Sequence, residues 1–297
     1  MRQVKFVMEA SDAEQMASES GMTIHQLLPT LVKTAQTMAR PPISNYRVGA
    51  VGIGSSGRII FGVNLEFPGL PLHHSVHAEQ FLVINLALHS ESSLTHLAVS
   101  AAPCGHCRQF LQEIRGASDI QVLVTSNNST FSFQPLSSFL PNRFGPDDLL
   151  DRDVPLVLER RHNDLLFVSS PVLLNGCLEP SVFETLREEA LGAANRSHAP
   201  YSECPSGVAL LDFNGMIYRG SYVESAAYNP SLGPVQAALI DYVASGGAEY
   251  EQIIAAVLVE REDALVRQES TARLLLRSVS PQCEFKTCHC SSPSGRS

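Results

Sequence analysis

Two short motifs carry the residues best suited to chemistry in this chain of 297 residues. His77-Ala78-Glu79 places an imidazole and a carboxylate two residues apart, and Pro103-Cys104-Gly105-His106-Cys107 places two thiols three residues apart. At the start of a helix, two cysteines with this spacing share one face, and unpaired backbone N–H groups stabilise their thiolates. Because imidazole and thiolate are common ligands of Zn²⁺, we predict a zinc site formed by His77, Cys104 and Cys107.

Three protein ligands leave one tetrahedral position of a zinc ion open to water, which is typical of catalytic sites. Glu79 lies in the same helical turn as His77 but points elsewhere, so it can exchange a proton with that water and with a substrate. Either motif alone could instead belong to a redox pair, a structural site or an ordinary core. A closed four-cysteine site would need another cysteine pair nearby, and Cys177 and Cys204 are single and lie in the other half.

The elements that position these motifs follow from the hydrophobic pattern. A helix is predicted within the first forty residues, because Leu27, Leu28, Leu31, Val32 and Ala35 recur at helical spacing before two prolines end it. Apolar segments at 48–53 and 58–64 predict a β-hairpin, and helices at 77–89 and 104–114 alternate with strands at 97–102 and 120–125. This order predicts an α/β domain in which each motif lies at the start of a helix.

The second half of the chain repeats the first at an offset of 158 residues. Four positions match: Ser44, Gly49, Gly62 and Glu66 correspond to Ser202, Gly207, Gly220 and Glu224. We infer a duplicated α/β unit. Its predicted parts are an N-terminal helical segment (1–40), a catalytic domain (41–135), a proline-punctuated linker (136–170) and a second domain (171–297).

The second copy lacks the chemistry of the first. Pro234-Val235-Gln236 is aligned with His77-Ala78-Glu79, and no Cys-x-x-Cys follows it. Proline offers no ligand atom and glutamine cannot act as a general base, so we expect one zinc ion per chain and a structural role for this half. Cys288-His289-Cys290 also looks like a metal motif, but we interpret it as part of a polar, serine-rich tail without further ligands.

Composition excludes several classes of protein. The chain carries 30 acidic and 21 basic residues, a net charge of -9, whereas proteins that bind a nucleic-acid backbone usually have a basic face. No apolar run approaches the ~18 residues of a membrane span. The acidic N-terminal segment leaves no signal-peptide core, and seven cysteines are too scattered for a secreted disulfide scaffold. We therefore expect a cytosolic protein that binds neither membrane nor nucleic acid.

The two motifs, together with their neighbours, resemble the zinc-dependent cytidine deaminases. The resemblance is carried by four blocks in family order: Tyr46-Arg-Val-Gly-Ala50, Gly62-Val-Asn-Leu-Glu66, His77-Ala-Glu-Gln80 and Pro103-Cys-Gly-His-Cys-Arg-Gln-Phe110. It runs over nearly the whole chain and is strongest with the long, two-domain, plant-type form. It implies a duplicated three-layer α/β fold, each unit a mixed sheet flanked by helices.

The resemblance also implies an activity and roles for residues. Cytidine or 2′-deoxycytidine and water would give the uridine nucleoside and ammonia in pyrimidine salvage, by attack of zinc-activated hydroxide at C4 with Glu79 as proton shuttle. Asn64 and Glu66 would bind the ribose, and Tyr46 stands where the family commonly has a phenylalanine against the base. The family's long form is a homodimer with one zinc per chain, and its substrate is the free nucleoside, because Glu66 would repel a phosphate.

Two alternatives remain at this stage. A deaminase acting on cytosine in DNA or RNA would have basic grooves and stacking aromatics, whereas this chain is acidic and has no tryptophan. A zinc-bearing regulatory module without activity would suit the second half but leaves Glu79 unexplained. Arg108 either bonds a cysteine sulfur or lies at the helix surface, and His106 points away from the metal face.

Overall fold

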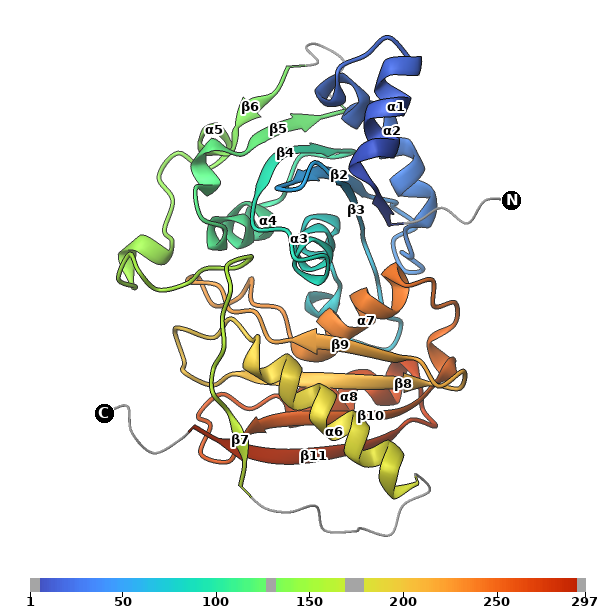
Figure 1. Ribbon diagram of the computed structural model, residues 1–297, viewed down its shortest axis with the longest axis vertical. Coiled ribbons are helices and arrows are strands. Elements are labelled where there is room, and N and C mark those ends of the chain that lie inside the picture. The colour runs from blue at the N-terminus through green and yellow to red at the C-terminus, as the bar shows by residue number, and fades with distance from the viewer. Residues whose placement is uncertain (1–5, 127–131, 169–178, 293–297) are drawn as a thin grey trace.

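The computed structural model describes residues 6–126, 132–168 and 179–292, and these form two α/β units (Figure 1). Within them, the strands make a six-stranded sheet in the order β1-β3-β2-β4-β5-β6 and a five-stranded sheet in the order β7-β11-β10-β8-β9. The strands are β1 (Val7–Met8), β2 (Gly49–Gly54), β3 (Ile59–Val63), β4 (Leu94–Val99), β5 (Gln121–Val124), β6 (Gln134–Pro135), β7 (Leu166–Phe167), β8 (Ser206–Asp212), β9 (Ile217–Ser221), β10 (Ile253–Arg261) and β11 (Glu284–Ser291). The helices are α1 (Ala10–Glu19), α2 (Ile24–Met38), α3 (Ala78–Leu88), α4 (Gly105–Phe110), α5 (Leu136–Phe139), α6 (Pro180–Asn195), α7 (Pro234–Ala244) and α8 (Glu269–Val279).

Both sheets have the same mixed topology. In the first, β2 pairs antiparallel with β3 and β4, and β4 pairs parallel with β5. In the second, β8 pairs antiparallel with β9 and β10, and β10 pairs parallel with β11. Short turns join the hairpins β2–β3 and β8–β9, whereas the parallel pairs β4–β5 and β10–β11 are connected through the crossover helices α4 and α8. The predicted duplicated α/β fold is confirmed.

Helices cover both faces of each sheet, which gives three layers. A Cβ on Gly49 of β2 would lie 2.7 Å from backbone atoms of α2, and a Cβ on Gly62 of β3 would lie 2.2 Å from the Ala78 carbonyl oxygen of α3. Gly62 is the cross-strand partner of Ala50, the neighbour of Gly49, so α2 and α3 lie on opposite faces. Gly207 and Gly220 have the same relation to α6 and α7.

The other two matched positions of the repeat are joined by hydrogen bonds. Glu66 accepts bonds from the backbone N–H groups of Ile43 and Ser44, each at 2.8 Å, and from the Ser44 hydroxyl at 2.5 Å. Glu224 accepts the equivalent bonds from the backbone of Tyr201 and Ser202 and from the Ser202 hydroxyl. All four repeated positions therefore have a structural reason: two allow close helix packing and two fix a loop.

The structure corrects the alignment of the second copy at its central helix. Helices α3 and α7 have the same length and follow His77 and Gly233, respectively, so their offset is 156 residues. The counterpart of Glu79 is thus Val235, and Gln236 is the counterpart of Gln80; the predicted pairing of Gln236 with Glu79 is wrong by one residue. The turn after Val223 is two residues shorter than the turn after Leu65, which shifts the register. Neither Gly233 nor Val235 carries a ligand atom or a proton-transferring group.

Two segments differ from the sequence interpretation. Cys288-His289-Cys290 lies in β11, between β7 and β10, and Cys290 is fully buried against the second core; the prediction of a polar tail is wrong. The N-terminal helical stretch is two helices, and Thr23 caps α2 by accepting a bond from the Gln26 N–H, as its residue type predicts. Across the described ranges, each helix is too short or too polar to span a bilayer.

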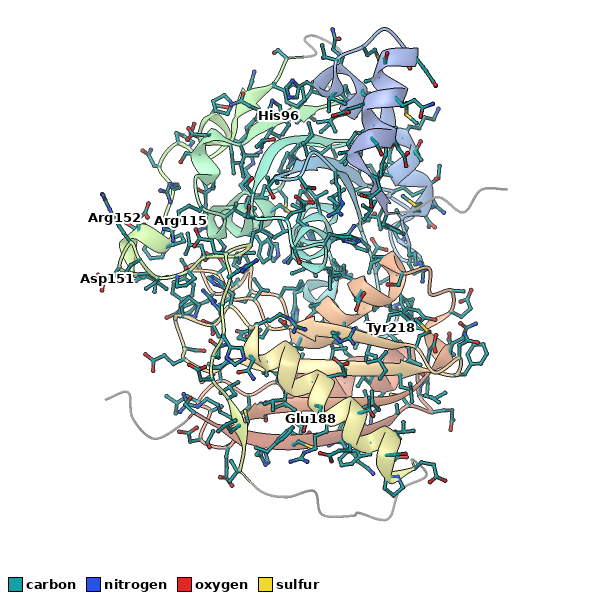
Figure 2. The ribbon with its side chains drawn as sticks, in the orientation of Figure 1. His96, Arg115, Asp151, Arg152, Glu188 and Tyr218 are labelled. Atoms are coloured by element: carbon teal, nitrogen blue, oxygen red, sulfur yellow. The ribbon has the colours of Figure 1, made fainter. Side chains whose placement is uncertain are left out.

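The linker and the two units are tied together by polar contacts. Arg115 binds both carboxylate oxygens of Glu159 at 2.9 Å, which holds the linker against the first unit on the side where Figure 2 shows Arg115 and Arg152. Glu113, 1% exposed, accepts three bonds from the second unit: from Tyr201 Oη at 2.6 Å, Ala226 N at 2.8 Å and His198 Nε2 at 3.2 Å. A buried carboxylate needs such donors, so Glu113 helps to fix how the units meet.

Gly220→Ala should destabilise the fold by about 3 kcal/mol, because the added methyl would lie within 2.2 Å of backbone atoms of α7 that cannot move independently. Chemical denaturation measures the change. Gly192→Ala is the control, because Gly192 lies within α6 with open space around its Cβ position, and alanine favours a helix. Equal stability of Gly220→Ala and the unaltered protein would contradict the close packing.

Candidate active site

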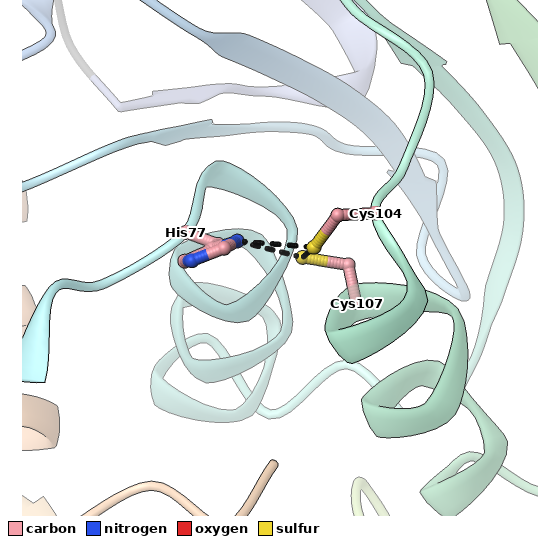
Figure 3. Close-up of side chains that lie close together, drawn as sticks. All are labelled: His77, Cys104 and Cys107. Carbon is pink, nitrogen blue, oxygen red and sulfur yellow. Dashed lines mark hydrogen bonds between the residues drawn. The ribbon is translucent and has the colours of Figure 1, made fainter. Parts of the chain in front are cut away.

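The three predicted metal ligands meet where two helices begin (Figure 3). His77 is the residue before α3, Cys104 is the residue before α4, and Cys107 lies in the first turn of α4. His77 Nδ1 is 3.4 Å from Cys104 Sγ and 3.3 Å from Cys107 Sγ, and the two sulfurs are 3.7 Å apart. Tetrahedral zinc requires about 3.6 Å between nitrogen and sulfur and about 3.8 Å between sulfurs. The donor set therefore fits a zinc ion. Among the described residues, these three form the group of His, Cys, Asp or Glu side chains close enough together to hold a metal ion.

The local electrostatics favour thiolate at Cys104. Hydrogen bonds from the Cys107 thiol and from the His77 ring lower the pKa of Cys104 to about 3. The same Cys104 sulfur raises the pKa of His77, and that sulfur together with burial raises the pKa of Cys107. A divalent cation would replace these shared protons, since metal binding deprotonates both cysteines.

Glu79 lies beside the ligands without being one of them. Its side chain is 4% exposed, and its Oε2 accepts a hydrogen bond from Cys107 Sγ at 3.2 Å. Burial raises the pKa of this carboxyl. A carboxyl with a raised pKa both accepts and returns protons more readily near neutrality than an exposed one does.

Two of the predicted substrate-binding residues, Asn64 and Glu66, contact the segment that contains the third, Tyr46. Asn64 donates from Nδ2 to the Tyr46 carbonyl at 2.9 Å and accepts from the Val48 N–H at 2.9 Å, while Glu66 holds Ile43 and Ser44 as described above. Both side chains thus fix the backbone of residues 43–48, a function that sequence reasoning did not assign to them. The Tyr46 side chain is 61% exposed, so its ring is free to pack on a ligand.

Other residues near the motifs have defined partners. Arg108 donates from Nε to the Pro103 carbonyl at 2.7 Å and from Nη1 to the Phe139 carbonyl at 2.9 Å, so it fixes the loop before Cys104 rather than a sulfur. The His106 ring stacks on the His77 ring with 5.0 Å between centroids. Neither contact could be read from the motif, because the partners depend on how α3 and α4 meet.

The equivalent region of the second unit has other side chains. The residue before α8, where the first unit has Cys104, is Gln268. Tyr222 stands in the position of Asn64 and is 8% exposed, and burial raises its pKa to about 12. Together with Gly233 and Val235, these residues leave the second unit without the donor set of the first.

Comparison with known proteins gives consistent matches. The family description "Cytidine and deoxycytidylate deaminase zinc-binding region" matches residues 22–124 and, in a second form, residues 136–273. The chain is 59% identical to "Cytidine deaminase 1" of Arabidopsis thaliana over 98% of this chain and 99% of the relative, and 50% identical to "Cytidine deaminase 6" of the same plant over 97% and 98%. A solved cytidine deaminase from Mycobacterium tuberculosis is 28% identical, with a TM-score of 0.36 over 40% of this chain and 96% of that one.

Cys104→Ala should abolish stoichiometric binding of zinc, because it removes one of two thiolates and leaves an incomplete donor set. Metal analysis of the purified variant tests this. Cys283→Ala is the matched control, since Cys283 lies in the second unit, away from the group, and should keep the metal. Full zinc content in the Cys104 variant would rule out this set of ligands.

Proposed function

The chain belongs to the cytidine deaminase family of zinc-binding enzymes, and on that premise we propose that it hydrolyses free cytidine and 2′-deoxycytidine to uridine and 2′-deoxyuridine, with release of ammonia, in pyrimidine salvage. One observation carries the proposal: a His–Cys–Cys group of tetrahedral spacing lies beside a buried carboxyl that is not part of it. His77, Cys104 and Cys107 are the proposed ligands of one zinc ion per chain. When bound, zinc makes hydroxide available near pH 7 by lowering the pKa of water.

Glu79 is proposed to carry the protons of the reaction. It accepts a proton from the attacking water, gives it to N3 of the base, and assists departure of the amino group as ammonia. Its carboxyl is buried, and burial raises its pKa, so it holds a proton more readily than an exposed carboxyl does. The Glu79 carboxyl lies beside the position where the ligands converge, since its Oε2 is 3.2 Å from Cys107 Sγ.

The remaining hydrogen-bonding capacity of Asn64 and Glu66 suits a ribose. Asn64 Nδ2 has a second N–H beyond the one given to Tyr46. Glu66 Oε1 accepts the Ser44 hydroxyl and has a further lone pair for one more donor. A 3′-hydroxyl can both accept from the first and donate to the second. Tyr46 would pack its exposed ring on the base.

Charge favours a nucleoside over a polynucleotide. The net charge of the chain is -9, and a phosphate near Glu66 would be repelled. We also propose that the enzyme is cytosolic, because its ligand thiols need a reducing compartment, and that it is a homodimer. The homodimer is proposed from the resemblance to the long form of the family.

The proposed division of labour follows the two units. Residues 41–135 form the catalytic domain, with 1–40 as its N-terminal helical segment, and 136–170 link it to the non-catalytic residues 171–297. The second unit has Gly233, Val235 and Gln268 where the first has His77, Glu79 and Cys104, which supports this division.

Incubation with cytidine tests the function. The ultraviolet spectrum should shift to that of uridine with release of one ammonia per nucleoside, whereas single-stranded DNA should stay unchanged. Deamination of the DNA but not of the nucleoside would replace the proposal with a polynucleotide deaminase. Full zinc content without turnover of either substrate would favour a regulatory module.

Glu79→Gln should keep zinc and lose about 10²- to 10⁴-fold in kcat, because the amide has nearly the same shape but cannot carry a proton. Metal analysis and steady-state kinetics on one preparation separate the two effects. Normal turnover in this variant would remove Glu79 from the mechanism.

Glu66→Gln should lower kcat/KM by about 10- to 100-fold, since it weakens charge-assisted bonds to the 43–44 loop and to the ribose. Glu224→Gln weakens the equivalent loop bonds in the second unit and should leave kcat/KM unchanged. Kinetics with cytidine compare the two variants. Equal losses in both would mean that the carboxylates act only through stability.

A further inference from the structure

Two buried glutamines cross between the units in a reciprocal pattern. Gln80 Oε1 accepts the His77 N–H at 3.3 Å, and its Nε2 donates to the Pro230 carbonyl of the second unit at 3.1 Å. Gln236 Oε1 accepts the Gly233 N–H at 3.1 Å, and its Nε2 donates to the His74 carbonyl of the first unit at 3.1 Å. The amide orientation is unambiguous in both, because an N–H can only donate and a carbonyl can only accept.

The bond from Gln236 reaches the segment that carries a proposed zinc ligand. His74 ends a 3₁₀ turn (Leu72–His74), and His77 follows three residues later. Val76, between them, is paired through its N–H and its carbonyl with Leu65, at 2.9 Å each. The segment is therefore held by the first unit at Val76 and by the second unit at His74, on the two sides of Ser75.

The two polar atoms of the Gln236 amide bond different units: Oε1 bonds its own unit and Nε2 bonds the first unit. Its Oε1 closes the start of α7, and a Cβ on residue 233 would lie 2.6 Å from that oxygen, so the glycine there accommodates the bond. Its Nε2 is directed out of the unit, to His74. The side chain is only 6% exposed, which fixes it in place, although the described part of the second unit has no cluster of metal-type side chains.

We propose that Gln236, in the non-catalytic unit, is a positioning residue for the metal site: through the His74 carbonyl it fixes the backbone that presents the His77 imidazole to the two cysteines. This rests on the proposed zinc site. Outer groups that orient a metal ligand affect metal affinity as well as activity. Through Gln236 the second unit thus contributes to the metal site without supplying one of its three proposed ligands.

Two variants and a control test the proposal. Gln236→Met removes both bonds, whereas Gln236→Glu keeps the acceptor for the Gly233 N–H and loses the donor to His74. Both should raise the zinc dissociation constant about tenfold, measured by competition with a chromophoric chelator. They should also change the visible spectrum of the cobalt-substituted protein, which reports ligand geometry, and lower kcat more than they change KM.

Tyr201→Phe is the control, because it deletes a different hydrogen bond between the units, the one from Tyr201 Oη to Glu113. It should leave zinc affinity and the cobalt spectrum unchanged even where the melting temperature falls. If both Gln236 variants match Tyr201→Phe in affinity and spectrum, the proposal is wrong. If Gln236→Met does not fold, the zinc affinity and cobalt spectrum of Gln236→Glu decide the test. If these two properties change in Gln236→Met but not in Gln236→Glu, the proposal is also wrong. A parent protein without zinc would instead contradict the proposed function.

Discussion

The N-termini of two helices, α3 and α4, must lie close together for this molecule to have a metal site. His77 and Cys104 each precede a helix, and their donor atoms lie 3.4 Å apart although 27 residues separate them. Helices α3 and α4 reach that arrangement because α3 packs closely on β3, where Gly62 leaves room for its backbone, and because β4 leads directly into the loop before α4. The packing of helix on sheet therefore sets the distances between the proposed ligand atoms.

The duplication separates the framework from the chemistry. Both units keep the two glycines that admit helices and the serine–glutamate pair that fixes a loop. The groups that differ are those of the site: Gly233, Val235 and Gln268 in place of His77, Glu79 and Cys104. A fold can lose a site without losing stability, because site residues contribute little to the core that holds the sheets and helices together.

Sequence patterns predicted the local features well, because these depend on neighbouring residues. The helix periodicity from Leu27 to Ala35 and the motif positions before α3 and α4 follow from short-range chemistry. The order of strands and helices was also predictable from their alternation. The strand containing Cys288 was missed because polar residues alternate with cysteines there, and the shortened turn after Val223 displaced the alignment of α7 by one residue. Contacts between the units, such as Glu113 with Tyr201, have no local signal at all.

The reciprocal glutamines have a consequence for symmetry. Gln80 bonds the Pro230 carbonyl and its counterpart Gln236 bonds the His74 carbonyl, so this contact has the symmetry of an isologous dimer. In a dimer of identical copies, every substitution would change both sides of such a contact. In a single chain the two halves can differ, so a side chain of one half can keep its bond to the other half when the rest of its surroundings has changed.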